Sequence, residues 1–286
     1  MHYWFRSIPR FGIDCYWTSI EVSFSFVSRC PTSADNDNRP PAGKGVALDT
    51  DGSVCDSPCP SVVEVEHQEA DRVRQGMQAV LAENQETRSS FCSYPPSVVK
   101  IPTEGPPAFR RQYPLPYRLR PIVDNQIAEW LDLGIVCRAP IDSQWNSPIL
   151  AVPKEANKFR ICLDPRQINR ILVPDQSLIP RIDDLLDNTQ GFVIASSLDL
   201  WSSYNQFLIA PDDRVKTTFT WNGVKYMFVG APFGLSHLTS HFQRTMNALL
   251  SDFSTFTMVY VDDILVYSSG VEQHMTHLVA VIQRLI

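Results

Sequence analysis

Two adjacent aspartates between two short apolar runs place the strongest constraint on how this chain folds. Residues 256–261 and 264–268 are rich in β-branched and aromatic residues, and Asp262 and Asp263 separate them. This pattern predicts two antiparallel strands joined by a tight turn. Aspartate is common in turns, so an ordinary polar turn is one interpretation. A cation site is the other, because adjacent carboxylates repel one another unless a positive charge neutralises them.

A third carboxylate favours the cation site. Asp199 lies near the end of another β-rich run, residues 192–200, and would lie beside Asp262 and Asp263 if the strands are neighbours in one sheet. Hard divalent cations such as Mg²⁺ bind carboxylate oxygens together with substrate phosphates, and two such ions can hold the attacking and leaving oxygens of a phosphoryl transfer. The three aspartates are therefore expected to converge on one divalent-metal site.

Hydrophobic periodicity and turn signals predict a mixture of helices and strands around these acids. The expected strands lie near 148–153, 159–164, 217–221 and 224–229. The last two flank Asn222-Gly223, a strong hairpin signal. The expected helices lie at 67–85, 121–134, 236–250 and from about 272 onwards. Their apolar positions are Val73, Met77, Val80 and Leu81; Val123, Ile127, Trp130 and Leu131; Leu238, Phe242, Met246 and Leu249; and Met275, Leu278, Val279, Ile282 and Leu285.

A series of sequence blocks, in order along the chain, resembles one known family. The blocks are 109–113, 147–149, 159–164, 166–169, 180–186, Leu198-Asp199-Leu200, Ala231-Pro232-Phe233-Gly234-Leu235 and Tyr260-Val261-Asp262-Asp263. Together they resemble the reverse transcriptase, or RNA-directed DNA polymerase, of Ty3/Gypsy-type long-terminal-repeat retrotransposons. A match of many blocks in order is far less likely to arise by chance than a match of one motif.

The resemblance implies an α+β fold with the fingers and part of the ferredoxin-like palm of a right-hand polymerase. The expected divisions are a non-matching, largely disordered segment at 1–66, a helix and linker at 67–108, and the reverse transcriptase-like domain at 109–286, with fingers at about 109–180 and 207–237 and a partial palm at about 181–206 and 238–286. The last helix is still running at Ile286, so it is expected to leave an apolar face exposed.

The resemblance also implies a role for individual residues. Asp199 and Asp262 would be the bridging ligands of Mg²⁺ or Mn²⁺, with Asp263 as the third carboxylate and the Leu200 carbonyl as an auxiliary oxygen. The implied nucleotide-binding residues are Lys154, Arg160, Leu200, Ser202, Ser203, Tyr204, Phe233 and Gly234, and the implied nucleic-acid-binding residues are Arg110 and Arg111. Tyr204 matches the aromatic residue that blocks a ribose 2′-hydroxyl, although a buried packing role is an alternative interpretation.

Three departures from the family pattern bear on nucleotide affinity rather than on the metal ligands. Pro165 replaces a tyrosine, and proline cannot donate a ladder hydrogen bond within a strand. Trp201 and Ser203 replace an arginine and a glycine after Asp199, and 237–239 replace Asn-Ala-Pro.

Charge and composition are consistent with a nucleic-acid enzyme only locally. The formal net charge is −6, and the first 90 residues carry most of this net negative charge. The segment 97–120 is basic, as phosphate contacts require. Residues 31–61 have the composition of a flexible linker, and 1–30 resemble neither a membrane span nor a secretion signal, so no membrane partner is expected. An Asp-Thr-Asp-Gly run at 49–52 departs from the retroelement protease signature and is interpreted as a loop.

Cysteine and histidine usage add two expectations. Seven cysteines without a secretion signal indicate a reducing compartment, so an intracellular location is expected, in a cytoplasmic virus-like particle or in the nucleus. The spacing of the cysteines and histidines does not match a complete zinc-binding motif. We therefore interpret His237, His241, His274 and His277 as polar residues on helix surfaces.

The expected function is primer extension with deoxynucleoside triphosphates on an RNA or DNA template-primer. The thumb, RNase H and integrase regions are expected elsewhere in a parent polyprotein, and activity of this piece alone is expected to be weak. Two alternatives remain at this point: a catalytically silent nucleic-acid-binding remnant, whose binding would be salt-dependent, and a protein-interaction fragment, whose binding would withstand salt.

Overall fold

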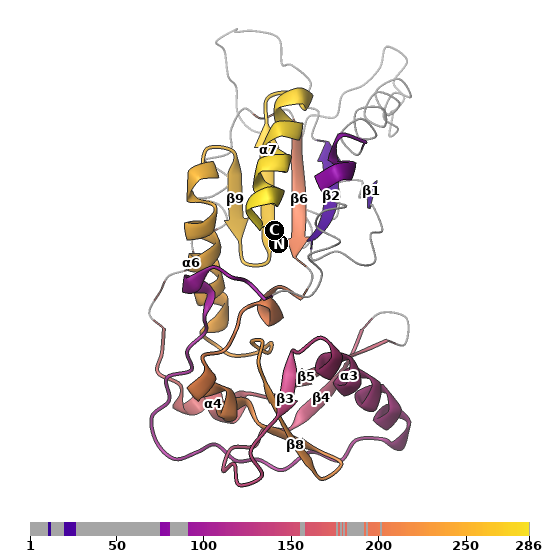
Figure 1. Cartoon of the computed structure of the whole chain (residues 1–286), viewed down its shortest axis with the longest axis vertical. Helices are drawn as coiled ribbons and strands as arrows, with labels where there is room; N and C mark the ends of the chain where they lie inside the picture. Colours follow the sequence, from indigo (N-terminus) through magenta and orange to yellow (C-terminus); the bar gives the residue numbers. More distant parts are fainter. Residues whose placement is uncertain are drawn as a thin grey trace, which may run out of the picture.

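The computed structural model describes residues 11–12, 20–26, 75–80, 91–154, 158–175, 177, 179, 181, 192, 194–200 and 202–285. These residues form two parts, which lie one above the other in Figure 1. The upper part contains a large sheet with the helices α6 (Leu238–Leu249) and α7 (Val271–Leu285), and the lower part contains two small sheets with the helices α3 (Arg120–Asp132) and α4 (Arg166–Ile171). Among the described residues, the helices are all too short or too polar to cross a membrane.

The large sheet has five strands in the order β1-β2-β6-β10-β9, and each neighbouring pair is antiparallel. Its strands are β1 (Phe11–Gly12), β2 (Ile20–Phe26), β6 (Ile194–Leu200), β9 (Thr257–Tyr260) and β10 (Asp263–Ser268). β9 and β10 form the hairpin that the two apolar runs predict. β2 lies in the segment that the sequence assigned to a non-matching region, yet it pairs along the whole of β6.

Two small sheets form most of the other part. One has the order β3-β8-β7, and the other is the hairpin β4-β5. Their strands are β3 (Val136–Arg138), β4 (Ile149–Pro153), β5 (Phe159–Leu163), β7 (Phe219–Trp221) and β8 (Val224–Phe228). The four expected strands are therefore present. Between β7 and β8, Asn222 and Gly223 have φ angles of 47° and 79°, as a two-residue hairpin turn with left-handed backbone requires.

Four labelled α-helices accompany these sheets: α3 (Arg120–Asp132), α4 (Arg166–Ile171), α6 (Leu238–Leu249) and α7 (Val271–Leu285). Short 3₁₀ helices η1 (Pro95–Ser97), η2 (Tyr117–Leu119), η3 (Ser203–Gln206), η4 (Pro211–Thr217) and η5 (Ser251–Phe253) connect them. The predicted boundaries of α3, α6 and α7 agree with the structure to within about two residues.

Aromatic packing holds α3 against the three-stranded sheet. Trp130 on α3 is buried, and its ring meets Phe219 and Phe228 edge-on at centroid distances of 6.5 Å and 5.2 Å. Both phenylalanines are almost fully buried. Edge-to-face rings at such distances add a favourable electrostatic contribution to the burial of apolar area. Trp130 therefore anchors the helix that the periodicity of 121–134 predicts.

The helix α7 packs on the large sheet, mainly against β10 and also against β6. Leu278 and Ile282 are fully buried, as predicted, while Met275, Val279 and Leu285 are partly buried and pack against the core. The exposed residues of α7 are all polar: Glu272, Gln273, Thr276, Gln283 and Arg284. The expectation of an exposed apolar face is therefore wrong. One cause is the helical segment 75–80, because a Cβ built on its Gly76 would lie 3.0 Å from the sulfur of Met275.

A buried histidine joins α7 to two strands of the large sheet. His274 has no exposed surface, whereas the sequence placed it on a polar helix surface. Its Nε2 lies 2.8 Å from the hydroxyl of Ser196, and its Nδ1 lies 2.9 Å from the hydroxyl of Ser268. Ser268 is also 2.8 Å from Nδ1 of His277. Burial, with a smaller repulsion from His277, lowers the pKa of His274 to about 4.

We expect the folded protein to lose stability in mild acid through His274. The pKa of this group is about 6.5 in an unfolded chain and lower in the fold, so its contribution is complete above pH 6.5 and is lost as the pH falls towards 4. The loss between pH 7.5 and pH 5 should be about 2 kcal/mol. Urea unfolding over this range tests it, with His274→Gln as comparison. An unchanged pH slope in that variant contradicts the assignment.

We also expect Gly230 to tolerate no side chain. A Cβ at Gly230 would overlap with the carbonyl oxygen of Asn205, and this contact is between backbones. Gly230→Ala should therefore lower the free energy of unfolding by about 3 kcal/mol, which a urea titration would measure. Gly270→Ala is the matched control, since nothing lies within 4 Å of a Cβ there and we expect little effect. Equal effects of the two substitutions would show that the close approach at Gly230 is unimportant.

Candidate active site

Two of the three aspartates lie opposite each other on neighbouring strands of the large sheet. Asp199 on β6 and Asp263, the first residue of β10, are direct partners in the antiparallel register. Direct partners project their side chains from the same face of a sheet, with Cβ atoms roughly 4.5–5.5 Å apart. Both residues are exposed. The register therefore brings two carboxylates from distant parts of the sequence to one place at the end of the sheet.

The third aspartate lies in the turn between β9 and β10. Asp262 follows Val261, whose φ of 54° is unusual for a β-branched residue. Gln243 on α6 holds this turn, since its side chain donates to the Val259 carbonyl at 2.8 Å and accepts from the Val261 N–H at 2.7 Å. Gln243 is almost fully buried. The sequence analysis missed it, although a polar residue next to Phe242 on an apolar helix face was a detectable signal.

The carboxylate of Asp262 is held from η3. The Ser203 hydroxyl donates to Oδ1 of Asp262 at 3.0 Å, and the hydroxyl of Tyr204 also bonds to this carboxylate. Burial raises the pKa of Tyr204 to about 12; a hydrogen bond with Thr239 opposes this rise, and the negative charge of Asp262 adds to it. The phenol is therefore a stable donor at neutral pH.

A row of side chains in contact, one guanidinium and three aromatic rings, connects the β4-β5 hairpin to this site. The Arg160 guanidinium on β5 lies 5.6 Å from the centre of the Phe233 ring, and Phe233 meets Tyr204 edge-on at 5.1 Å. Tyr204 also meets Phe242 of α6 edge-on at 5.2 Å. Tyr204 is buried, which agrees with the packing interpretation, and its place next to a nucleotide sugar stays a prediction. Arg160 is exposed and so available to a ligand.

The loop that carries Phe233 is fixed by α4. Asn169 donates to the carbonyl of Gly234 at 2.8 Å and accepts from the N–H of Ser236 at 3.1 Å. Gly234 has a φ of 98°, and a Cβ there would lie 3.0 Å from the ring of Pro165. Pro165 lies beyond the end of β5 and precedes α4, so the concern that it removes a ladder hydrogen bond was wrong. It packs on Gly234 instead.

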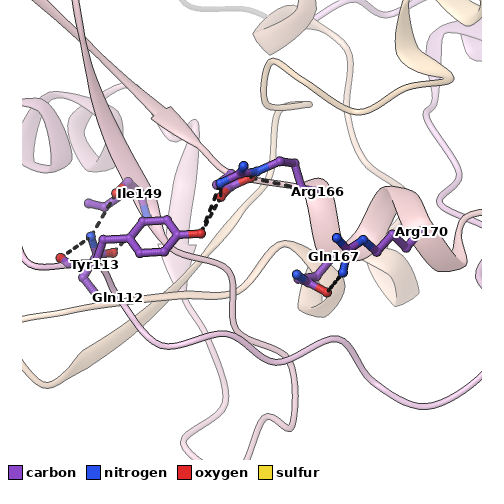
Figure 2. Close-up of polar contacts among 7 residues, drawn as sticks. Gln112, Tyr113, Ile149, Arg166, Gln167 and Arg170 are labelled. Carbon is purple, nitrogen blue, oxygen red and sulfur yellow. Dashed lines mark hydrogen bonds and ion pairs between the residues drawn. The ribbon is translucent and has the colours of Figure 1, made fainter.

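A buried carboxylate at the end of β5 organises the neighbouring surface. Asp164 accepts from Nε and an NH₂ group of Arg166 at 2.8 Å and 2.7 Å, and from the Tyr113 hydroxyl at 3.0 Å. Figure 2 shows the side chains of Tyr113 and Arg166 pointing toward one another. These contacts, with the Arg166 hydrogen bond first, lower the pKa of Asp164. Gln112 exchanges two hydrogen bonds with Ile149 of β4, at 2.9 Å and 2.8 Å. The segment before α3 is therefore attached to both strands of the hairpin.

The other predicted residues are exposed or lie at the ends of elements. Lys154 is exposed and donates its N–H to the Lys158 carbonyl at 2.7 Å, beside 155–157, which lie outside the described residues. Arg110 and Arg111 are exposed, and the Arg110 guanidinium lies 5.2 Å from the Tyr113 ring centre. The remaining two are Leu200, at the end of β6, and Ser202, which has a φ of 49°. The direction of the Lys154 side chain relative to the aspartates stays a prediction.

The aspartates do not form one metal-ready cluster in the described part of the chain, where no group of three or more acidic, histidine or cysteine side chains has metal-binding geometry. Asp262 lies in the turn, whereas Asp263 begins β10. Asp263 joins the ladder opposite Asp199, and Asp262 turns to Ser203. The expectation that all three converge is therefore met only for the pair Asp199 and Asp263.

Comparison with known proteins agrees with this geometry. Residues 152–286 match the family model described as reverse transcriptase (RNA-dependent DNA polymerase). This part of the chain is a reverse transcriptase domain. Similar proteins include the retrovirus-related Pol polyproteins from transposons 297 and gypsy of Drosophila melanogaster, which are 31% and 34% identical over 64% of the chain. The enzymatic polyprotein of cauliflower mosaic virus (strain Strasbourg) is 36% identical over 56% of the chain.

Solved structures support the same fold. The native prototype foamy virus protease-reverse transcriptase matches with a TM-score of 0.58 and 25% sequence identity. The match covers 69% of this chain and 25% of the foamy virus chain. A foamy viral protease-reverse transcriptase in complex with dsDNA has a TM-score of 0.67 and 24% identity, covering 76% of this chain and 45% of its own. The polymerase fold expected from the sequence is therefore confirmed, and the homologues are consistent with the Ty3/Gypsy type. The chain spans only 18% of the two Drosophila relatives.

We expect Asp164 to stabilise this reverse transcriptase domain through its charge. Asp164→Asn keeps the shape but loses the charge that accepts from Arg166 and Tyr113, so the free energy of unfolding should fall by about 2 kcal/mol. Asp252→Asn is the control, because Asp252 pairs with Arg284 at the exposed surface, where ion pairs contribute little. Urea unfolding of both variants measures the difference. A smaller effect at Asp164 than at Asp252 would refute the structural role.

Proposed function

We propose that this domain adds deoxynucleotides to the 3′-end of a primer, on an RNA or DNA template, with divalent cations as cofactors. The observation that carries the proposal is the register of β6 and β10, which sets Asp199 opposite Asp263 with Asp262 in the adjoining turn. The match of residues 152–286 to the reverse transcriptase family supports the reaction class.

The oxygen atoms at this end of the sheet are of the kind that a hard cation binds. Asp199, Asp262 and Asp263 offer carboxylate oxygens, which Mg²⁺ and Mn²⁺ prefer, and the Leu200 carbonyl at the end of β6 could add a further oxygen. When bound, such cations lower the pKa of a primer 3′-hydroxyl and neutralise the charge of a triphosphate. The contribution of the chain itself is to hold these oxygens in place, which the β6-β10 ladder and Gln243 accomplish.

The row from Arg160 to Tyr204 supports a nucleotide position beside the acids. A guanidinium presents a planar set of donors that suits phosphate oxygens, and Arg160 is exposed above Phe233. Lys154, at the tip of the same hairpin directly after β4, would add charge. Tyr204 and Phe233 would border the sugar, with Gly234 allowing the backbone to approach. Ser202 and Ser203 would present backbone N–H groups to the triphosphate.

The nucleic-acid partner is proposed to be a template-primer duplex. Three of the similar solved structures are described as complexes of foamy viral protease-reverse transcriptase, two with dsDNA and one with an RNA/DNA hybrid. In this chain Arg110 and Arg111 are exposed on the basic segment before α3, where they would contact phosphates.

Primer extension by the full chain tests the proposal. A primed homopolymer template with Mg²⁺ or Mn²⁺ should be extended, and Asp199→Asn or Asp262→Asn should reduce the rate roughly 10²–10³-fold, because fewer carboxylates remain to hold the cations. Template-primer affinity at fixed salt should change by less than about threefold, since these acids are not phosphate contacts.

The matched control is again Asp252→Asn, which removes an exposed carboxylate that pairs with Arg284 and should leave extension unchanged. Undiminished extension by Asp199→Asn and Asp262→Asn would refute the proposed site. Salt-dependent binding by the unmodified chain without any extension would instead identify a silent nucleic-acid-binding domain.

A further inference from the structure

The side chain of Asp262 is held by a hydroxyl group of the segment that follows β6. Here the Ser203 hydroxyl donates to Oδ1 of Asp262 at 3.0 Å. Hydrogen bonds to ionised carboxylates are roughly twice as strong as those between neutral groups. The Ser203 hydroxyl therefore makes a directed interaction with a proposed metal ligand.

The donor is itself rigid. Ser203 is only 4% exposed and begins η3, where the Asn205 N–H bonds to the Ser202 carbonyl at 2.8 Å. The next residue, Tyr204, is clamped edge-on between Phe233 and Phe242. A hydroxyl on such a fixed segment can restrain the carboxylate that accepts its hydrogen bond. A hydroxyl on a mobile loop would instead move together with the carboxylate.

The restraint acts at a place where the backbone already has an unusual shape. Asp262 lies in a tight turn after a residue of positive φ, and Gln243 fixes that turn through Val259 and Val261. Gln243 orders the backbone but does not reach the carboxylate in these two bonds. Ser203 and Tyr204 supply the missing order at the side chain.

We propose that Ser203 is a positioning residue that fixes the Asp262 carboxylate for divalent cation binding. This inference rests on the proposed function, in which Asp262 is a cation ligand. A carboxylate held in one rotamer loses less conformational entropy when a cation binds, so the preorganised site binds more tightly. Loss of the hydroxyl should therefore weaken cation affinity.

Manganese binding by the full chain tests this without reliance on catalysis. Titration of Mn²⁺, followed by the electron paramagnetic resonance of the free ion, gives the dissociation constant. Ser203→Ala and Ser203→Gly should raise it about 3–10-fold, because both remove the donor. Ser203→Thr keeps the hydroxyl and should remain within about twofold of the unmodified chain. In primer extension, the cation concentration for half-maximal rate should rise by the same factor in the alanine variant.

Ser240→Ala is the matched control. The Ser240 hydroxyl donates to Asp175 at 3.0 Å, so this variant removes an equally long hydroxyl–carboxylate bond elsewhere and should leave Mn²⁺ affinity unchanged. Thermal melts establish that each variant is folded. If Ser203→Thr does not fold because of its extra methyl group, the alanine and glycine variants decide the result.

Asp262→Asn separates the two levels of the proposal. If it weakens Mn²⁺ binding while Ser203→Ala and Ser203→Gly bind as tightly as the unmodified chain or more tightly, the role of Ser203 is refuted and the metal site stands. If Asp262→Asn has no effect on Mn²⁺ binding, Asp262 is not a ligand, and both the metal assignment and the role of Ser203 fall.

Discussion

The pairing of β6 with β10 is the interaction on which the rest of the molecule depends. Six successive register pairs, from Asp263 with Asp199 to Ser268 with Ile194, join segments that lie far apart in the sequence. A shift of one residue would move each side chain to the other face of the sheet. That shift would remove Asp199 from its place opposite Asp263 and would also expose Leu198 and Ile264, which are now fully buried.

The buried face of this sheet protects the register. Ser196 and Ser268 lie on the two paired strands, and both bond to the same imidazole of His274. A slipped strand would carry one of these hydroxyls away and leave a buried ring nitrogen without a partner, which costs about 1–3 kcal/mol. Apolar packing and this polar contact therefore favour the same alignment of β6 with β10. This alignment determines the positions of Asp199 and Asp263.

Local patterns were sufficient to predict the elements but not their distant partners. Asn222-Gly223 and the alternation around it predicted the β7-β8 hairpin, because turn chemistry acts within a few residues. The pairing of β2 with β6 had no such local signal and was missed. His274 was misplaced for the same reason, since its partners on β6 and β10 are recognisable only in three dimensions. Within the site, the three aspartates could be predicted from the sequence motif. The contacts of Gln243 and Ser203 could be recognised only in the folded structure.

The position of β2 has a consequence for the acid-bearing strand. With β2 on one side and β10 on the other, β6 has hydrogen-bonded neighbours along both edges. An unpaired edge offers a row of N–H and C=O groups to any other extended chain, which is a common route to aggregation. The segment from Ile20 to Phe26 thus acts as a cover strand, so that the strand bearing Asp199 is closed to association with a second molecule.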